Sequence, residues 1–126
     1  MPIFTSVDHV NRMVHGTALG RVTAQEVDEH LKLERHFNGL VYPEIIDARV
    51  ANLDLSPEDV RSIVALVRTM SVENKFGPAA VIVYNDVAFG VVWTLGVLVN
   101  DVVAIAPFRS EVEAQAWLNQ RQRNKS

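Results

Sequence analysis

The residues of this chain best suited to acid–base or metal chemistry are a histidine and a glutamate one helical turn apart. His30 and Glu34 lie within a segment, residues 24–37, that has the pattern of an amphipathic helix. An imidazole beside a carboxylate serves both metal sites and general acid–base sites. The spacing is not the His-Glu-x-x-His of zinc hydrolases, so the preferred interpretation is an intrahelical ion pair at the edge of the buried face. A metal site and an acid–base pair are the alternatives.

A second candidate is the carboxylate of Asp47, which ends a predicted strand over residues 42–48 and precedes Arg49 by two positions. Such a carboxylate can act as a general base, or it can accept backbone amides and hold the loop that leads to Ser56. No neighbouring nucleophile, second base or metal ligand accompanies it. The structural role is therefore favoured.

Absent residues and motifs exclude several classes of function. The chain has no cysteine, which excludes disulfides and thiolate sites and suits a reducing, cytoplasmic location. It has neither a glycine-rich dinucleotide motif nor a phosphate-binding loop nor a Gly-x-Ser-x-Gly elbow, so we expect no cofactor, no metal and no catalytic set. The net charge is −3, and no basic face with interleaved aromatic residues predicts nucleic-acid binding. No signal peptide is visible at the N-terminus.

Strand and helix patterns alternate along the chain. Alternation of apolar and polar residues, a buried apolar run and capping signatures predict strands over 3–7, 12–19, 42–48, 79–84 and 102–108, and helices over 24–37, from 57, over 86–99 and after 110. This β-β-α-β-α-β-α-β-α order predicts an α/β fold with a mixed, mostly parallel five-stranded sheet and helices on its faces. We expect one domain, residues 1–126.

The segment predicted as the third helix, residues 86–99, has almost no polar side. Its length of about 21 Å is short of the roughly 30 Å of a bilayer core, so it predicts no membrane span. An apolar outer face must be covered by a second subunit, a partner protein or an apolar ligand, unless neighbouring elements of the same chain bury it. We predict a homodimer built partly on this helix. The candidate contact residues are Phe89, Val92, Trp93 and Gly96.

Four short motifs together resemble the SpoIIAA-like (STAS-like) family. They are residues 45–49 (Ile-Ile-Asp-Ala-Arg), 53–59 (Leu-Asp-Leu-Ser-Pro-Glu-Asp), 86–90 (Asp-Val-Ala-Phe-Gly), and 108–110 with 116–118. The resemblance implies a sheet of about five strands with helices on its faces. Members resemble anti-sigma-factor antagonists, which dock a protein partner and are switched by serine phosphorylation at a helix start.

Ser56 is the counterpart of that switch serine by position. Here Pro57, Glu58 and Asp59 follow it, and the two acids oppose a phosphate at the same helix end. A helix-capping role is therefore favoured over a phosphoswitch. The preferred function is a non-enzymatic regulatory module that binds a protein partner. The alternatives are a binding protein for a small apolar, lipid-like ligand and, less favoured, an enzyme that uses Asp47 or the His30–Glu34 pair.

Overall fold

The computed structural model describes residues 3–123. Residues 1–2 and 124–126 of the predicted domain, residues 1–126, lie outside the described range. Five strands and four helices follow the predicted order. They are β1 (Ile3–Asp8), β2 (Met13–Arg21), α1 (Ala24–His36), β3 (Glu44–Asn52), α2 (Pro57–Ser71), β4 (Ala79–Ile82), α3 (Asp86–Leu98), β5 (Ile105–Phe108) and α4 (Glu111–Arg123).

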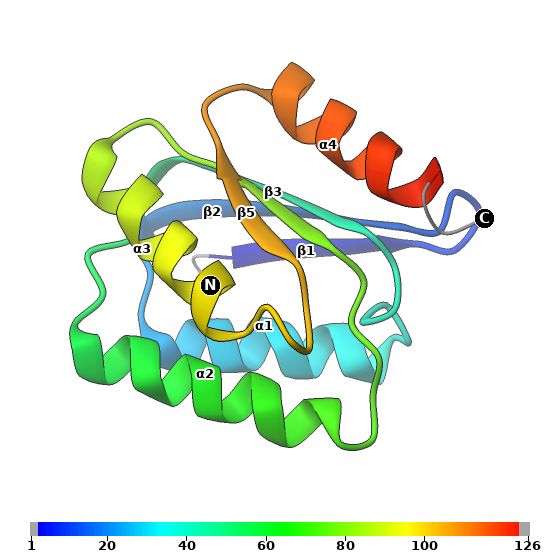
Figure 1. Cartoon of the computed structure of the whole chain (residues 1–126), viewed down its shortest axis with the longest axis horizontal. Coiled ribbons are helices and arrows are strands. Elements are labelled where there is room, and N and C mark those ends of the chain that lie inside the picture. The colour runs from blue at the N-terminus through cyan, green and yellow to red at the C-terminus, as the bar shows by residue number, and fades with distance from the viewer. Residues whose placement is uncertain (1–2, 124–126) are drawn as a thin grey trace.

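The strands form a single sheet in which spatial order matches chain order, β1-β2-β3-β4-β5 (Figure 1). The hairpin of β1 and β2 is antiparallel, and every later pairing is parallel. Each parallel pair is joined by a helical crossover, as parallel strands require. The predicted α/β class and the mixed, mostly parallel sheet are therefore confirmed.

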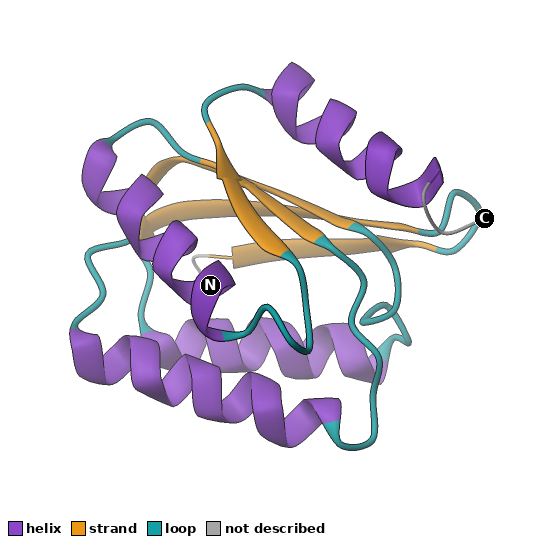
Figure 2. Ribbon diagram, in the orientation of Figure 1, coloured by secondary structure: helices purple, strands orange, loops and turns teal. Residues whose placement is uncertain are grey.

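Helices cover both faces of the sheet, with α1, α2 and α3 on one face and α4 on the other (Figure 2). The alternation of side chains along β4 shows this division. Val81 packs in the core beneath α3, whereas Ala80 and Ile82 pack against Leu118 of α4. Because successive strand residues point to opposite faces, the continuous apolar run of β4 belongs to a strand buried on both sides.

Helix starts follow the capping residues in the sequence. Thr23 and Glu26 form a reciprocal capping box at α1, and Ser56 forms one with Asp59 at α2. Asn85 accepts the backbone amide of Ala88 at the start of α3. These side chains satisfy amides that lack a partner in the first turn of a helix.

Several predicted boundaries are wrong by a few residues. β3 continues to Asn52, so Asp47 lies within the strand and does not end it. β5 begins at Ile105, because the amides of Val102 and Val103 bond to the Val99 carbonyl in a turn that follows α3. These amides prolong the helix end instead of joining the sheet.

Candidate functional site

Three ionisable side chains meet in the interior of the protein, and we call His30, Glu34 and Glu44 the buried triad. They are 5%, 3% and 7% exposed. His30 Nε2 lies 2.8 Å from Glu44 Oε2 and 2.5 Å from Glu34 Oε1. The predicted pair of His30 and Glu34 is thus formed, but it is fully buried and includes a second carboxyl group.

Three elements position the triad. His30 and Glu34 share one face of α1, and Glu44 opens β3 with its side chain toward that helix. Thr5 of β1 completes the arrangement, since its Oγ1 lies 2.7 Å from His30 Nδ1. Both nitrogens of the imidazole therefore have partners, which fixes the orientation of the ring.

Burial and mutual charge shift the pKa of all three groups. Burial disfavours the imidazolium, but the charge of Glu44 and the close contacts with both glutamate side chains outweigh it and raise the pKa of His30 to about 10. Burial, together with the charge of Glu44, raises the pKa of Glu34 to about 9. For Glu44, burial is outweighed by the charge of His30 and by hydrogen bonds from both neighbours, so its pKa is lowered. At neutral pH the triad therefore holds a charged His30, a charged Glu44 and a protonated Glu34.

The donor set of the triad also matches a metal site in composition. One ligand atom from each residue lies within 4.8 Å of the others. Ligand atoms around a tetrahedral zinc ion, at bond lengths of about 2.0–2.1 Å, would be about 3.3 Å apart. The observed separations from the imidazole, 2.5 and 2.8 Å, are both shorter, and the second is a hydrogen bond to Glu44. The triad as folded is therefore arranged to share protons.

A cavity of about 130 Å³ lies beside the triad, between the sheet and helices α1, α2 and α3. Among the described residues that line it, His30 and Glu44 are the only polar ones. The others are aliphatic, such as Val81 on the sheet, Leu31 on α1 and Val92 on α3. The site is thus an apolar chamber with one polar end.

A smaller cavity of about 50 Å³ also borders the triad. Glu34 and Glu44 line it together with Tyr42 and Phe76. Glu44 lines both cavities. Glu44 is therefore the member of the triad that borders both spaces.

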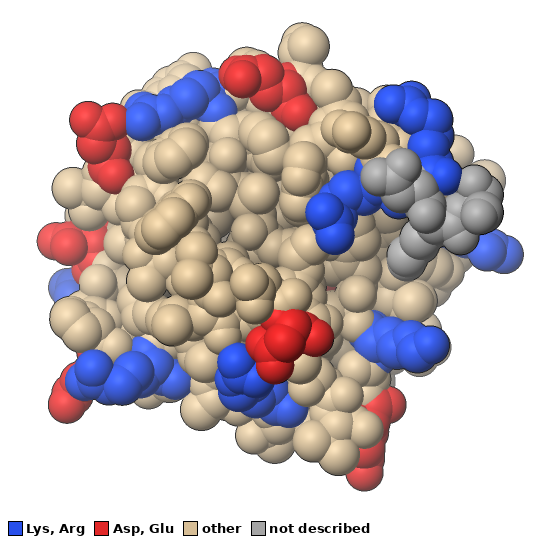
Figure 3. Space-filling view, viewed as in Figure 1, with Lys and Arg blue, Asp and Glu red and all other residues tan. Residues whose placement is uncertain are grey.

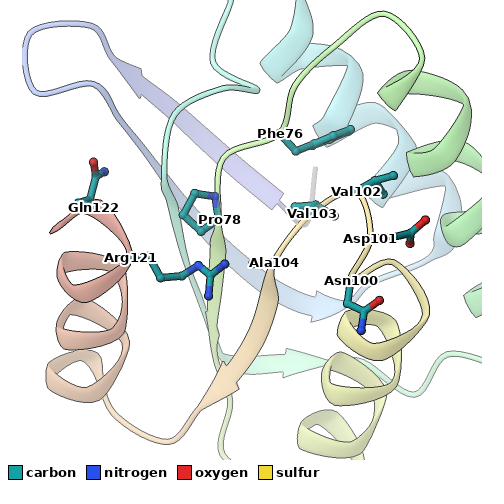
Figure 4. Close-up of a pocket in the computed structure, with 9 residues that line it drawn as sticks. All are labelled: Phe76, Pro78, Asn100, Asp101, Val102, Val103, Ala104, Arg121 and Gln122. Atoms are coloured by element: carbon teal, nitrogen blue, oxygen red, sulfur yellow. The ribbon is translucent and has the colours of Figure 1, made fainter. Parts of the chain in front are cut away.

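A wider hollow of about 420 Å³ opens on the surface near the end of α4 (Figure 4). Arg121 and Asp101 are the charged residues in its lining. Asp101 forms an ion pair with Arg68, and Arg121 lies over the ring of Trp117. Because these charges already have partners and no candidate from the sequence lines the hollow, it is a weaker site than the internal cavity.

One side of α3 exposes apolar residues to solvent. Val87, Trp93, Val97 and Leu98, which we call the outer face of α3, are between 44% and 59% exposed. In Figure 3 the surface over the middle of this helix carries no charged side chain. Within residues 3–123, none of the helices has both the length and the apolar character needed to cross a bilayer.

The prediction of an outward contact surface is wrong for two of its four residues. Val92 is 4% exposed and packs in the core beneath the helix. Gly96 is buried against β5, where an added methyl group would collide with the backbone carbonyl of Ile105. Its lack of a side chain serves close packing within the chain and not contact with a second molecule. Phe89 is half-buried beneath the guanidinium of Arg109, and Trp93 alone is largely exposed.

Asp47 and Ser56 lie apart from the triad and have structural partners. Asp47 accepts the backbone amide of Arg49 and forms an ion pair with its guanidinium at 2.7 Å, which lowers the pKa of Asp47. Ser56 accepts the amide of Asp59 as the cap of α2. The helix-capping role of Ser56 is confirmed, and neither residue lines the internal cavity.

Two members of the site escaped the sequence prediction. Glu44 and Thr5 approach His30 from strands that are distant in sequence. The two-residue repeat of a strand could have indicated Glu44, because Glu44, Ile46 and Ala48 are two residues apart and must share one face. Ile46 and Ala48 line the cavity, as this parity requires.

Comparison with known proteins identifies the fold. No family model matches the sequence, and no curated protein sequence matches it. The structure of the chain is similar to a solved structure, that of an uncharacterised protein of the DUF3478 family with a SpoIIAA-like fold from Shewanella loihica PV-4. The two chains are 19% identical and superpose with a TM-score of 0.57 over 92% of this chain and 93% of the other.

The chain has a SpoIIAA-like fold. The resemblance predicted from the sequence motifs is therefore confirmed for the architecture. At 19% identity it extends to the fold alone. Many unrelated functions share one fold, so the activity of this SpoIIAA-like domain has to be argued from its own side chains.

Proposed function

We propose that this SpoIIAA-like domain binds a small, mainly apolar molecule in the cavity between the sheet and α1–α3. The observation that carries the proposal is the cavity itself, about 130 Å³ of aliphatic lining with His30 and Glu44 at one end. An apolar cavity of roughly 150 Å³ takes up benzene. The proposed ligand is therefore about the size of a single aromatic ring.

Packing energetics support this proposal. Protein interiors are close-packed, and residual cavity volume costs roughly 24 cal/mol per Å³. For about 130 Å³ this is a cost of roughly 3 kcal/mol, a large part of the net stability of a small domain. A ligand that fills the space restores the lost contacts.

The test measures stabilisation by toluene. At ten times its dissociation constant, toluene should raise the melting temperature by about 5 °C. Val81→Leu, which places a larger side chain in the cavity, should reduce that shift. The matched control is Val83→Leu, because Val83 is fully buried on the same side of the sheet but does not line the cavity. Absence of a shift in the wild type, or equal loss in both variants, contradicts the proposal.

A binding role is proposed in preference to catalysis. Within the described chain, His30 has both glutamates and Thr5 as partners, and Asp47 is paired with Arg49. Asp47 does not join the triad in one pocket, as an enzyme using all these groups would require. The lack of cysteine supports a cytoplasmic setting for this binding protein.

A second candidate function is that of a regulatory module that docks a protein, with a homodimer as the simplest case. It is supported by the outer face of α3, where Trp93 is 59% exposed. Contiguous exposed apolar surface marks interaction sites. Light scattering after gel filtration should give a dimer mass at micromolar concentration, and Trp93→Glu should give a monomer. Val112→Glu is the control, since Val112 is exposed on α4. A wild-type monomer contradicts the homodimer.

A further inference from the structure

The polar end of the cavity offers more hydrogen-bond acceptors than donors. Glu34 and Glu44 together bring four carboxyl oxygens. The facing donors of the triad are the Nε2–H of His30 and the proton of Glu34, which is hydrogen-bonded to Glu44. Glu34 Oε1 is buried and accepts no hydrogen bond from the described residues, although it lies beside the imidazole. A carboxylate has about four acceptor positions, and His30 and Glu34 use two of those on Glu44. The triad therefore has acceptor capacity for one more donor.

Glu44 is the member of the triad that both retains acceptor positions and lines the large cavity, because Glu34 does not line it. Its carboxylate borders the large cavity and also the small one, and it is one of the two polar groups in the large one. The second polar group, His30, already directs Nδ1 to Thr5 and Nε2 to the two glutamates. The cavity thus presents a hydrogen-bond acceptor to its occupant and no spare donor.

We propose that the cavity selects an uncharged alcohol or phenol whose hydroxyl group donates to Glu44, and that it rejects carboxylic acids. This inference rests on the proposed binding function. The triad has a net charge of zero, with one cation and one anion. A ligand carboxylate would bring a second anion that has no cation to pair with, and burying an unpaired charge is strongly unfavourable.

The order of affinities within a set of probes of one ring tests the inference. In a purely apolar cavity, toluene binds more tightly than phenol because the phenol hydroxyl loses its hydrogen bonds to water. Here phenol should bind at least about tenfold more tightly than toluene, as one good hydrogen bond provides. Anisole, which has the oxygen but cannot donate, should bind no better than toluene. Benzoate should show no binding at neutral pH.

Isothermal titration calorimetry with the full chain measures the four dissociation constants. The matched variant replaces the triad by apolar residues of similar size, His30→Leu with Glu34→Met and Glu44→Met. This variant should reverse the order, so that toluene binds more tightly than phenol. If the variant does not fold, the wild-type series alone is decisive. Comparison of phenol with anisole shows whether the ligand must donate a hydrogen bond or only accept one.

Each outcome separates the two proposals. Binding of toluene with phenol no tighter, or anisole as tight as phenol, overturns the inference and leaves the binding function intact. Benzoate as the tightest ligand overturns it as well. Failure of every probe to bind overturns both the inference and the proposed function.

Discussion

Two regions of this molecule reverse the usual distribution of side chains, and they do so in opposite senses. Inside the fold, the buried triad places three ionisable groups at 3–7% exposure. On the surface, the outer face of α3 exposes four apolar side chains at 44–59%. Both arrangements are unfavourable unless something compensates them.

The difference lies in where the compensation comes from. The imidazole and carboxyl groups of the triad contact one another at 2.5 and 2.8 Å, so each buried charge has its partner within the chain. The apolar residues of the outer face have no such cover among the described residues, since Trp93 is 59% exposed. The charges of the triad are therefore paired within a single chain, whereas cover for the outer face of α3 depends on the proposed docking function.

The largest effect is expected when the triad is broken by removing its cation. His30→Leu leaves two buried carboxyl groups without a positive charge and should lower the free energy of unfolding by about 3–5 kcal/mol. Replacing all three residues by Leu and Met should be neutral or stabilising, by about 1–4 kcal/mol, because no charge is then left unpaired. Urea denaturation at pH 7 measures both.

The control for this comparison is His36→Leu, on the same helix. His36 is exposed, so its replacement should change the stability by less than about 0.5 kcal/mol. If the triple variant is as unstable as His30→Leu, the triad contributes net stability to the fold, and the view that its charges only compensate one another is wrong.

Sequence reasoning reached the fold because the local signals agree with the global one. The capping boxes at Thr23 and Ser56 and the apolar run of β4 each mark an element that the structure contains. With alternating strands and helices, the rule of right-handed parallel crossovers leaves few arrangements. The order of elements was therefore predictable, while boundaries such as the start of β5 depend on turn contacts.

The site was only half predictable, for physical reasons. The spacing of His30 and Glu34 is a local helical property, but their contact with Glu44 depends on packing of α1 against the sheet. The cavity depends on how many side chains, distant in sequence, pack against one another, and no local pattern in the sequence indicates this. In α3 apolar residues lie on every side of the helix, so the sequence pattern does not indicate which side faces the core. Val92 and Gly96 were therefore predicted on the outward side, although both are buried.

For each unit of pH, an effect of intermediate size is expected from the titration of the triad. In the folded protein the pKa of Glu34 is about 9, whereas in the unfolded chain it is near 4.5. The pKa of His30 is about 10 in the folded protein and near 6.5 in the unfolded chain. Between pH 6.5 and 9 the folded state therefore binds two more protons, and its stability falls as pH rises. The slope is at most about 1.4 kcal/mol per pH unit for each proton.

The triple apolar variant isolates this effect. The difference in unfolding free energy between wild type and variant, measured in urea from pH 5 to 9.5, should decline with pH, and more steeply above pH 6.5. A difference that stays constant over this range would mean that the triad does not hold the two extra protons. The assignment of a charged His30 and a protonated Glu34 to the buried triad would then be wrong.

The smallest effect sharpens the comparison within one helix. Val92 and Val97 are the same residue type, five positions apart, which places them on different sides of α3. Val92 is 4% exposed and lines the cavity, whereas Val97 is 48% exposed. Val92→Ala should lower the unfolding free energy by about 2 kcal/mol, and Val97→Ala by less than about 0.5 kcal/mol. Denaturation of dilute protein, where any dimer is dissociated, measures the two values. If Val97→Ala costs as much as Val92→Ala under those conditions, the outer face is stabilised within its own chain, and the case for a second molecule on α3 is lost.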